Sequence, residues 1–186
     1  MQIPEIEYSE ARQSDLPELV DIFESSFSHL TKNERLVRDV LALYISSAKQ
    51  GFIVARSSRK AIGFAIAQKS LLAPWAELLK NPFNFWLFIL TPRSCFITPP
   101  LYRHFFVPAP HIITLAVSSG WRGRGIATSL LSKAVSYLRA EGAKKVYSEI
   151  ETDNKAIAAA CMKLGFKTFK TFRKSGLHWQ AMAAEL

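Results

Sequence analysis

The stretch VSSGWRGRGIA, residues 117–127, joins a predicted strand to a predicted helix. The first amides of a helix have no intrahelical partners and carry the positive end of its dipole, so such a junction favours an anion. Gly123 and Gly125 let the backbone approach a bulky ligand, and Arg122 and Arg124 add positive charge. The stretch therefore predicts a pyrophosphate cradle, with an ordinary solvated turn as the alternative.

The stretch fits neither common nucleotide motif. No Gly-Lys-Ser/Thr follows its glycines, as a P-loop requires, and the three-glycine spacing of dinucleotide-binding folds is absent. A different pyrophosphate-bearing ligand is therefore expected.

Hydrophobic periodicity around the stretch predicts a mixed α/β domain. Helices are expected at 15–27, 33–49, 125–140 and 154–164, with Asp15 as the cap of the first helix. Strands are expected at 52–56, 61–69, 111–117, 145–151, 166–172 and 178–183.

Composition limits the protein class. With 186 residues, 49% of them hydrophobic, the chain fits a single domain, 1–186, with a sizeable core. Its two cysteines, Cys95 and Cys161, lack metal-ligand spacing and are too few for a disulfide scaffold, which favours a reducing compartment, the cytoplasm, and no metal. Four acidic residues within 1–15 argue against a secretion signal.

The formal charge of +9 is unevenly distributed. Residues 1–50 hold 5 basic and 9 acidic residues, whereas 111–186 hold 12 and 5. Such a field attracts anions, including nucleic acid, an acidic membrane surface or a phosphate-bearing small molecule, and charge alone does not choose among them.

Residues 71–110 differ from the rest, because they hold seven prolines and many aromatic residues. A short helix is expected between Pro82 and Pro92. The apolar run 83–90 is far shorter than the ~20 residues of a membrane span. The segment is interpreted as an acceptor-site wall, as a surface for a second copy of the chain or for peripheral membrane contact, or as extra core.

Two motifs resemble the GNAT superfamily of acyl-CoA-dependent N-acyltransferases. Residues 122–127, RGRGIA, are similar to its Arg/Gln-x-x-Gly-x-Gly/Ala signature, and Asn154, Ile157 and 163–166, KLGF, are similar to its later helix motif. The resemblance implies a mostly antiparallel central sheet of about six to seven strands flanked by helices, with 71–110 as an insertion before the cofactor strand. It also implies acetyl-CoA as the co-substrate, with the pyrophosphate on the signature loop.

The resemblance implies which residues bind the co-substrate: Leu115, Ala116, Val117, Arg122, Gly123, Arg124, Gly125, Ile126, Ala127, Thr128, Asn154 and Lys163. The Val117 amide would serve the thioester carbonyl, and Asn154 the pantetheine arm or simply its helix as a cap.

An amine attacking a thioester must lose a proton, because an alkyl amine with a pKa near ~10.4 is mostly protonated at neutrality. Glu149 is the first candidate for the base and Glu151 the second, with His111 as a weaker relay. Many family members place a tyrosine acid where this chain has Cys161, which fits small core filler equally well. Tyr147, Tyr102 or solvent are the other candidates for the acid.

The sequence therefore predicts an N-acetyltransferase that acts on a primary amine of a small molecule or amino sugar by direct attack in a ternary complex. A protein N-terminal or lysine acetyltransferase is the alternative. A silent CoA-binding module or a basic nucleic-acid-binding domain is the alternative from another class, although no nucleic acid is expected as a partner.

Overall fold

The computed structural model describes residues 5–29, 33–70, 80, 110–174 and 176–186. They form a seven-stranded sheet in the order β1-β2-β3-β4-β5-β7-β6. The strands are β1 (Ile6–Glu10), β2 (Phe52–Ser57), β3 (Lys60–Gln68), β4 (His111–Val117), β5 (Lys145–Glu151), β6 (Lys167–Lys174) and β7 (Leu177–Glu185). All neighbours are antiparallel except β4 and β5, so the mixed, mostly antiparallel sheet is confirmed.

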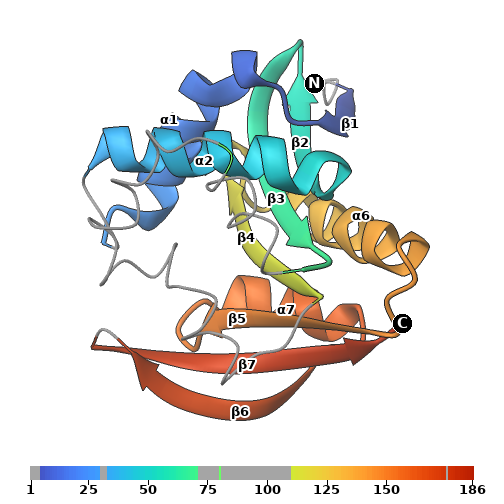
Figure 1. The fold of residues 1–186 in the computed structure, drawn as a ribbon. Coiled ribbons are helices and arrows are strands. Elements are labelled where there is room, and N and C mark those ends of the chain that lie inside the picture. Colours follow the sequence, from blue (N-terminus) through green and yellow to red (C-terminus); the bar gives the residue numbers. More distant parts are fainter. Residues whose placement is uncertain (1–4, 30–32, 71–79, 81–109, 175) are drawn as a thin grey trace.

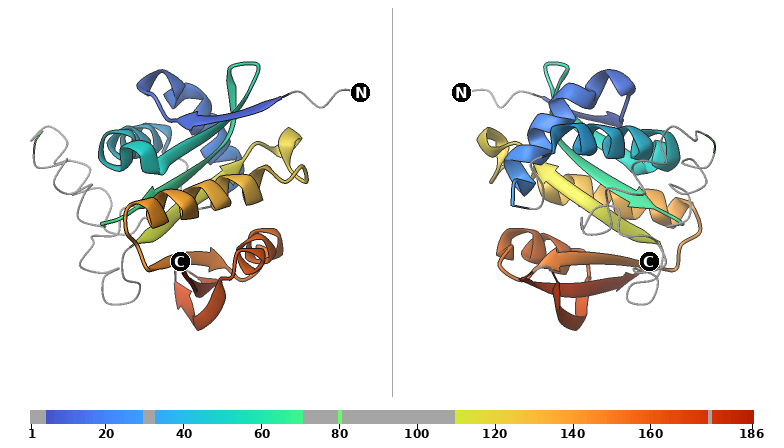
Figure 2. Two further views of the ribbon diagram at one scale, coloured as in Figure 1. Left: turned by 90° about the vertical axis from the view of Figure 1, so that its right-hand side faces the viewer. Right: turned by 60° about the vertical axis from the view of Figure 1, so that its left-hand side comes forward.

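Helices cover both faces of this sheet (Figures 1 and 2). α1 (Leu16–Phe27) and α2 (Glu34–Ala48) bury one apolar side each against β2 and β3, around Phe52 and Phe64. On the other face, α6 (Ile126–Ala140) and α7 (Lys155–Lys163) pack with Val146, Ile150 and Met182. The described part of the chain contains no helix long and apolar enough to cross a membrane.

The parallel pair β4 and β5 is the feature that positions the site. The two strands are in register only at His111↔Tyr147 and Ile112↔Ser148, and the Ser148 hydroxyl donates to the Ile112 carbonyl at 3.2 Å. After these pairs the strands no longer form a ladder, although β4 continues to Val117 and β5 to Glu151. The facing edges of both strands are therefore available for a ligand.

The predicted helices and strands are confirmed, with ends that agree or differ by one or two residues. One strand was missed: β1 pairs with β2, but its short run IEYSE mixes apolar and acidic residues and gives a weak signal. The short helix expected between Pro82 and Pro92, and most of the insertion, lie outside the described residues.

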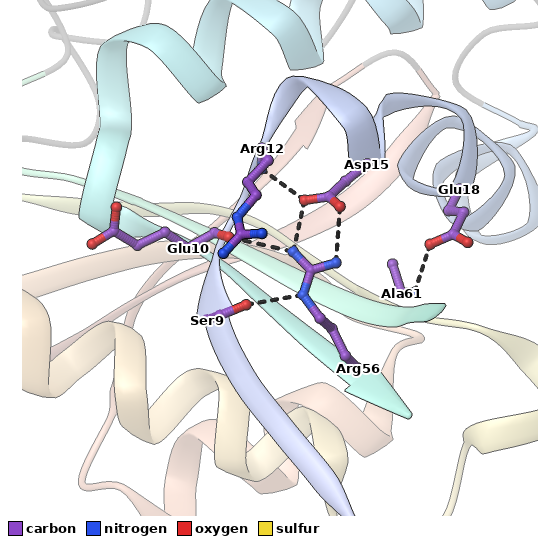
Figure 3. Close-up of polar contacts among 7 residues, drawn as sticks. All are labelled: Ser9, Glu10, Arg12, Asp15, Glu18, Arg56 and Ala61. Carbon is purple, nitrogen blue, oxygen red and sulfur yellow. Dashed lines mark hydrogen bonds and ion pairs between the residues drawn. The ribbon is translucent and has the colours of Figure 1, made fainter. Parts of the chain in front are cut away.

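Asp15 does not cap α1 through its side chain, which corrects the sequence-based expectation. Its carboxylate instead accepts from the Arg12 amide at 2.7 Å and from two nitrogens of Arg56 at 2.8 and 2.7 Å (Figure 3). Arg56 also donates to the Ser9 hydroxyl at 2.9 Å. This network ties the start of α1 to β1 and β2, away from the candidate site.

Candidate active site

The predicted anion cradle lies between β4 and α6, at the short 3-10 turn η4 (Ser119–Trp121). Gly123 and Gly125 have φ values of 76° and 79°, and no atom lies within 4 Å of the position a Cβ would take at either. Gly125 precedes α6, and the first amide bonded back to its carbonyl is that of Ser129, at 3.0 Å. The amides of 126–128 therefore have no partner within the helix, as an anion site requires.

A hollow, which we call the cradle hollow, opens beside these amides. Most of its lining was predicted from the sequence: Leu115, Ala116, Val117, Arg122, Gly123, Gly125, Ile126, Ala127, Thr128, Asn154 and Lys163. Six other lining residues were not among the predicted cofactor-binding residues: Ser26, Phe27, Trp121, Ala156, Ile157 and Ala160.

The two arginines of the loop have different environments. Arg122 donates to the Val117 carbonyl at 3.0 Å and to the Ser26 hydroxyl at 3.2 Å, so it ties the loop to β4 and α1. Arg124 lies 4.8 Å from the centroid of the Trp121 ring and is not among the residues lining the hollow. Arg122 lines the hollow, and the contact of Arg124 with a ligand stays a prediction.

The free edge of β4 presents backbone groups to the cradle hollow. The amide of Ser118 donates to Ile62 of β3 at 2.9 Å. Because successive residues of a strand direct their N–H and C=O groups to opposite edges, the amides of Val117 and Leu115 point away from β3, towards the side that β5 has left. The bond from Arg122 to the Val117 carbonyl agrees with this direction.

A second hollow, the carboxylate hollow, lies between the separated strands. It is lined by Phe27, Ile112, Ile113, Thr114, Leu115, Leu131, Ser148, Glu149, Ile150, Glu151, Asn154, Ile157, Cys161 and Trp179. Phe27, Leu115, Asn154 and Ile157 line both hollows, so the two adjoin. Both candidate bases, Glu149 and Glu151, are therefore next to the predicted cofactor site.

Asn154 lies where the hollows meet. Its side chain accepts from the Ile157 amide at 3.3 Å and caps α7. The cap role is thus present together with a position suited to ligand contact.

Glu151 has a partner that the sequence did not reveal. Its Oε1 lies 2.8 Å from Nε2 of His29, which follows the end of α1. The contact joins elements 122 residues apart, and only the fold brings them together. Glu149, two residues earlier, lines the same hollow.

Cys161 lines the carboxylate hollow but is only 1% exposed. Burial raises the pKa of its thiol to about 12. A CoA-like thiolate, with a thiol pKa near ~8.5, would gain a proton from such a group only at a cost of roughly 4 to 5 kcal/mol. The local chemistry favours the core-filler interpretation of Cys161.

The remaining candidates are not brought to either hollow. Tyr147 lies in T-shaped contact with Phe169, with ring centroids 6.0 Å apart, and lines a separate surface hollow with Lys145. His111 is buried at the start of β4 and is absent from both linings. Tyr102 lies outside the described residues. Among the residues that the structure describes, no three His, Cys, Asp or Glu side chains come together as metal ligands would.

The fold and the loop together define a protein whose sheet opens between two parallel strands beside an anion cradle. The model of the Acetyltransferase (GNAT) family matches residues 16–166. The chain belongs to this family.

Two curated proteins share part of the sequence. A mycothiol acetyltransferase of Corynebacterium glutamicum is 42% identical over 55 residues, which is 30% of this chain and 19% of that protein. The N-alpha-acetyltransferase 30 of Schizosaccharomyces pombe is 35% identical over 60 residues, or 32% of this chain and 40% of that protein. The matched regions thus span less than half the length of either relative.

Solved structures share the whole fold. In the crystal structure of the NatC complex bound to Gag peptide and CoA, one chain aligns with a TM-score of 0.69 and 16% identity, covering 98% of this chain and 99% of that chain. At this identity the likeness establishes the fold alone.

Proposed function

We propose that the protein is an acetyl-CoA-dependent N-acetyltransferase that acts on a primary amine by direct attack within a ternary complex. One observation carries the proposal: the cradle hollow and the carboxylate hollow adjoin at the edge of β4. A donor whose pyrophosphate lies on the cradle would extend its thioester along this edge, towards Glu149.

The cradle suits the pyrophosphate of CoA. Amides 126–128 supply the helix terminus, and the left-handed Gly123 and Gly125 keep side chains out of the hollow. Lys163 adds a cation to the lining, and Asn154 in the same lining supports contact with the pantetheine arm. This combination supports CoA as the co-substrate.

The reaction balances with the groups at hand. The ammonium of the acceptor gives a proton to Glu149, directly or through water, and the free amine attacks the thioester carbon. The Val117 amide, at the free edge of β4, is placed to stabilise the carbonyl oxygen as the new C–N bond forms. The C–S bond then breaks, the attacking nitrogen loses its second proton to solvent, and the thiolate takes a proton from solvent. The amide and the thiol leave, and Glu149 returns its proton to solvent.

The class of acceptor is the finer part of the proposal. We favour a small amine or amino sugar. The names of the two curated relatives divide between mycothiol and an N-alpha amino group, so a protein amino terminus is the second candidate.

Thermal unfolding with and without acetyl-CoA, followed by thiol release with a panel of amines, tests the proposal. Saturating ligand at about 100 times Kd should stabilise the fold by roughly 2.7 kcal/mol. Thiol release that depends on the amine supports transfer. Stabilisation with no thiol release from any amine would leave a silent CoA-binding module instead.

A further inference from the structure

The wall of the carboxylate hollow contains a polar group for which the proposed reaction gives no role. Trp179 of β7 is 9% exposed and lines this hollow. Its indole Nε1 is buried and has no hydrogen-bond partner among the residues that the structure describes. An unsatisfied buried donor is rare and costs about 1–3 kcal/mol, so it calls for an explanation.

The sheet places Trp179 beside the candidate base. Trp179 is the register partner of Glu151, and Glu149 is the partner of Ala181, one step along the same face. Glu149 and Trp179 are therefore diagonal neighbours on adjacent strands, at about 7–8 Å, within reach of one small molecule. Ala181 and Glu151 occupy the other two corners of this group of four residues, and the alanine side chain is too small to fill the space beside Trp179.

Glu149 and Trp179 both line this hollow, together with Glu151, which contacts His29 at 2.8 Å. A ligand in the hollow meets a carboxylate at Glu149 and an indole N–H donor at Trp179. Tryptophan donates through Nε1 and accepts nothing there, so its ligand group must be a hydrogen-bond acceptor.

We infer that Trp179 recognises the acceptor substrate by donating its indole N–H to an oxygen that lies three bonds from the reacting nitrogen. α-Amino amides and amino sugars carry such an oxygen, and plain alkyl amines do not. This inference rests on the proposed function and adds a substrate class to it. Trp179 is a specificity-determining contact, with no part in the proton transfer.

Trp179→Phe tests the inference, because it keeps an aromatic ring and removes the N–H. The probes are two pairs of amines, each with a member that lacks the oxygen: L-alaninamide with sec-butylamine, and D-glucosamine with cyclohexylamine. Binding to the CoA-saturated protein is measured by calorimetry, and turnover by thiol release. The pKa of each amine has the same effect on wild type and variant, so it cancels when the two proteins are compared. Any loss of packing affects both amines of a pair, so it cancels when the two amines are compared.

For at least one oxygen-bearing amine, the variant should bind about tenfold more weakly and show a raised KM with little change in kcat. The affinity for the matched amine without the oxygen should fall only by the amount that the loss of packing causes for both amines. An equal loss for both members of each pair, or no binding of either oxygen-bearing amine to the wild type, would overturn the inference.

The readouts separate this inference from the proposed function. Trp179-dependent binding of an amine without thiol release would support the subsite and reject acetyl transfer. Acetyl transfer to amines with and without the oxygen, equally affected by Trp179→Phe, would support the proposed function and reject the subsite.

Discussion

The imidazole Nε2 of His29 lies 2.8 Å from Oε1 of Glu151, and this contact links the end of α1 to the end of β5 across the mouth of the open sheet. The His29 side chain is 43% exposed and that of Glu151 is 23% exposed, so the free energy of the contact itself is expected to be small, about 0.2–1 kcal/mol. The contact matters for the position of two elements, α1 and β5, which both border the carboxylate hollow and which it holds together.

A double-mutant cycle of His29→Ala and Glu151→Gln tests this role. If each change acts by releasing α1 from β5, each should raise the KM for the amine, and the double variant should resemble either single one. The measurement is kcat/KM for wild type and three variants. Additive losses would mean that the two residues act separately, and a loss of kcat confined to Glu151→Gln would identify Glu151 as the base.

Gly125→Glu should abolish binding of CoA by filling the cradle hollow with a carboxylate. The matched control is Gly142→Glu, which follows the other end of α6 and has nearly the same φ, 81° against 79°. Both variants carry similar backbone strain, and neither Cβ meets an atom within 4 Å. Calorimetry should find CoA affinity lost only in the first variant. Equal affinity in both would refute the cradle.

Glu149→Gln should lower kcat/KM most below about pH 8 and less at higher pH, where a larger fraction of an alkyl amine is already neutral. The expected loss at neutrality is about 10²–10⁴-fold. The pH profile of kcat/KM is the measurement. A loss that is uniform across the range would indicate a binding or structural role.

Asp15→Asn should lower the free energy of unfolding by roughly 3 kcal/mol at neutral pH, because it leaves Arg56 without its carboxylate partner. The two side chains are 9% and 12% exposed. Burial alone raises the pKa of Asp15, but hydrogen bonds from Arg56 and the Arg12 amide outweigh it and leave that pKa lowered.

The lowered pKa of Asp15 in the folded state determines how the free energy of unfolding changes with pH. The contribution of Asp15 is fully present above its unfolded value, near ~3.9, and is lost as the pH falls through the lower folded value. Urea unfolding at several pH values should therefore show the difference between wild type and Asp15→Asn shrinking in acid.

Asp39→Asn is the matched control for this experiment. Burial raises the pKa of Asp39 despite the nearby Arg35 and Arg38, so the pH dependence of its contribution has the opposite sign. If the difference between wild type and Asp15→Asn were independent of pH, the ion pair would not be its source.

The elements of the fold were predictable where the sequence signal is local. Periodic apolar residues fix α1, α2 and α6, and the glycines around Arg122 mark the turn before α6. β1 was missed because its strand character depends on pairing with β2, which lies more than 40 residues later.

Part of the candidate site was also predictable from local sequence, and part was not. The cradle lies on one continuous stretch, and the sequence alone predicted it, because backbone conformation and helix termini are set by neighbouring residues. The tertiary structure decided the surroundings of the side chains that line the hollows: it buried Cys161, paired Glu151 with His29 and placed Trp179 beside Glu149. These relationships join residues of separate elements or depend on burial. Only the packing of the sheet and its helices can establish them.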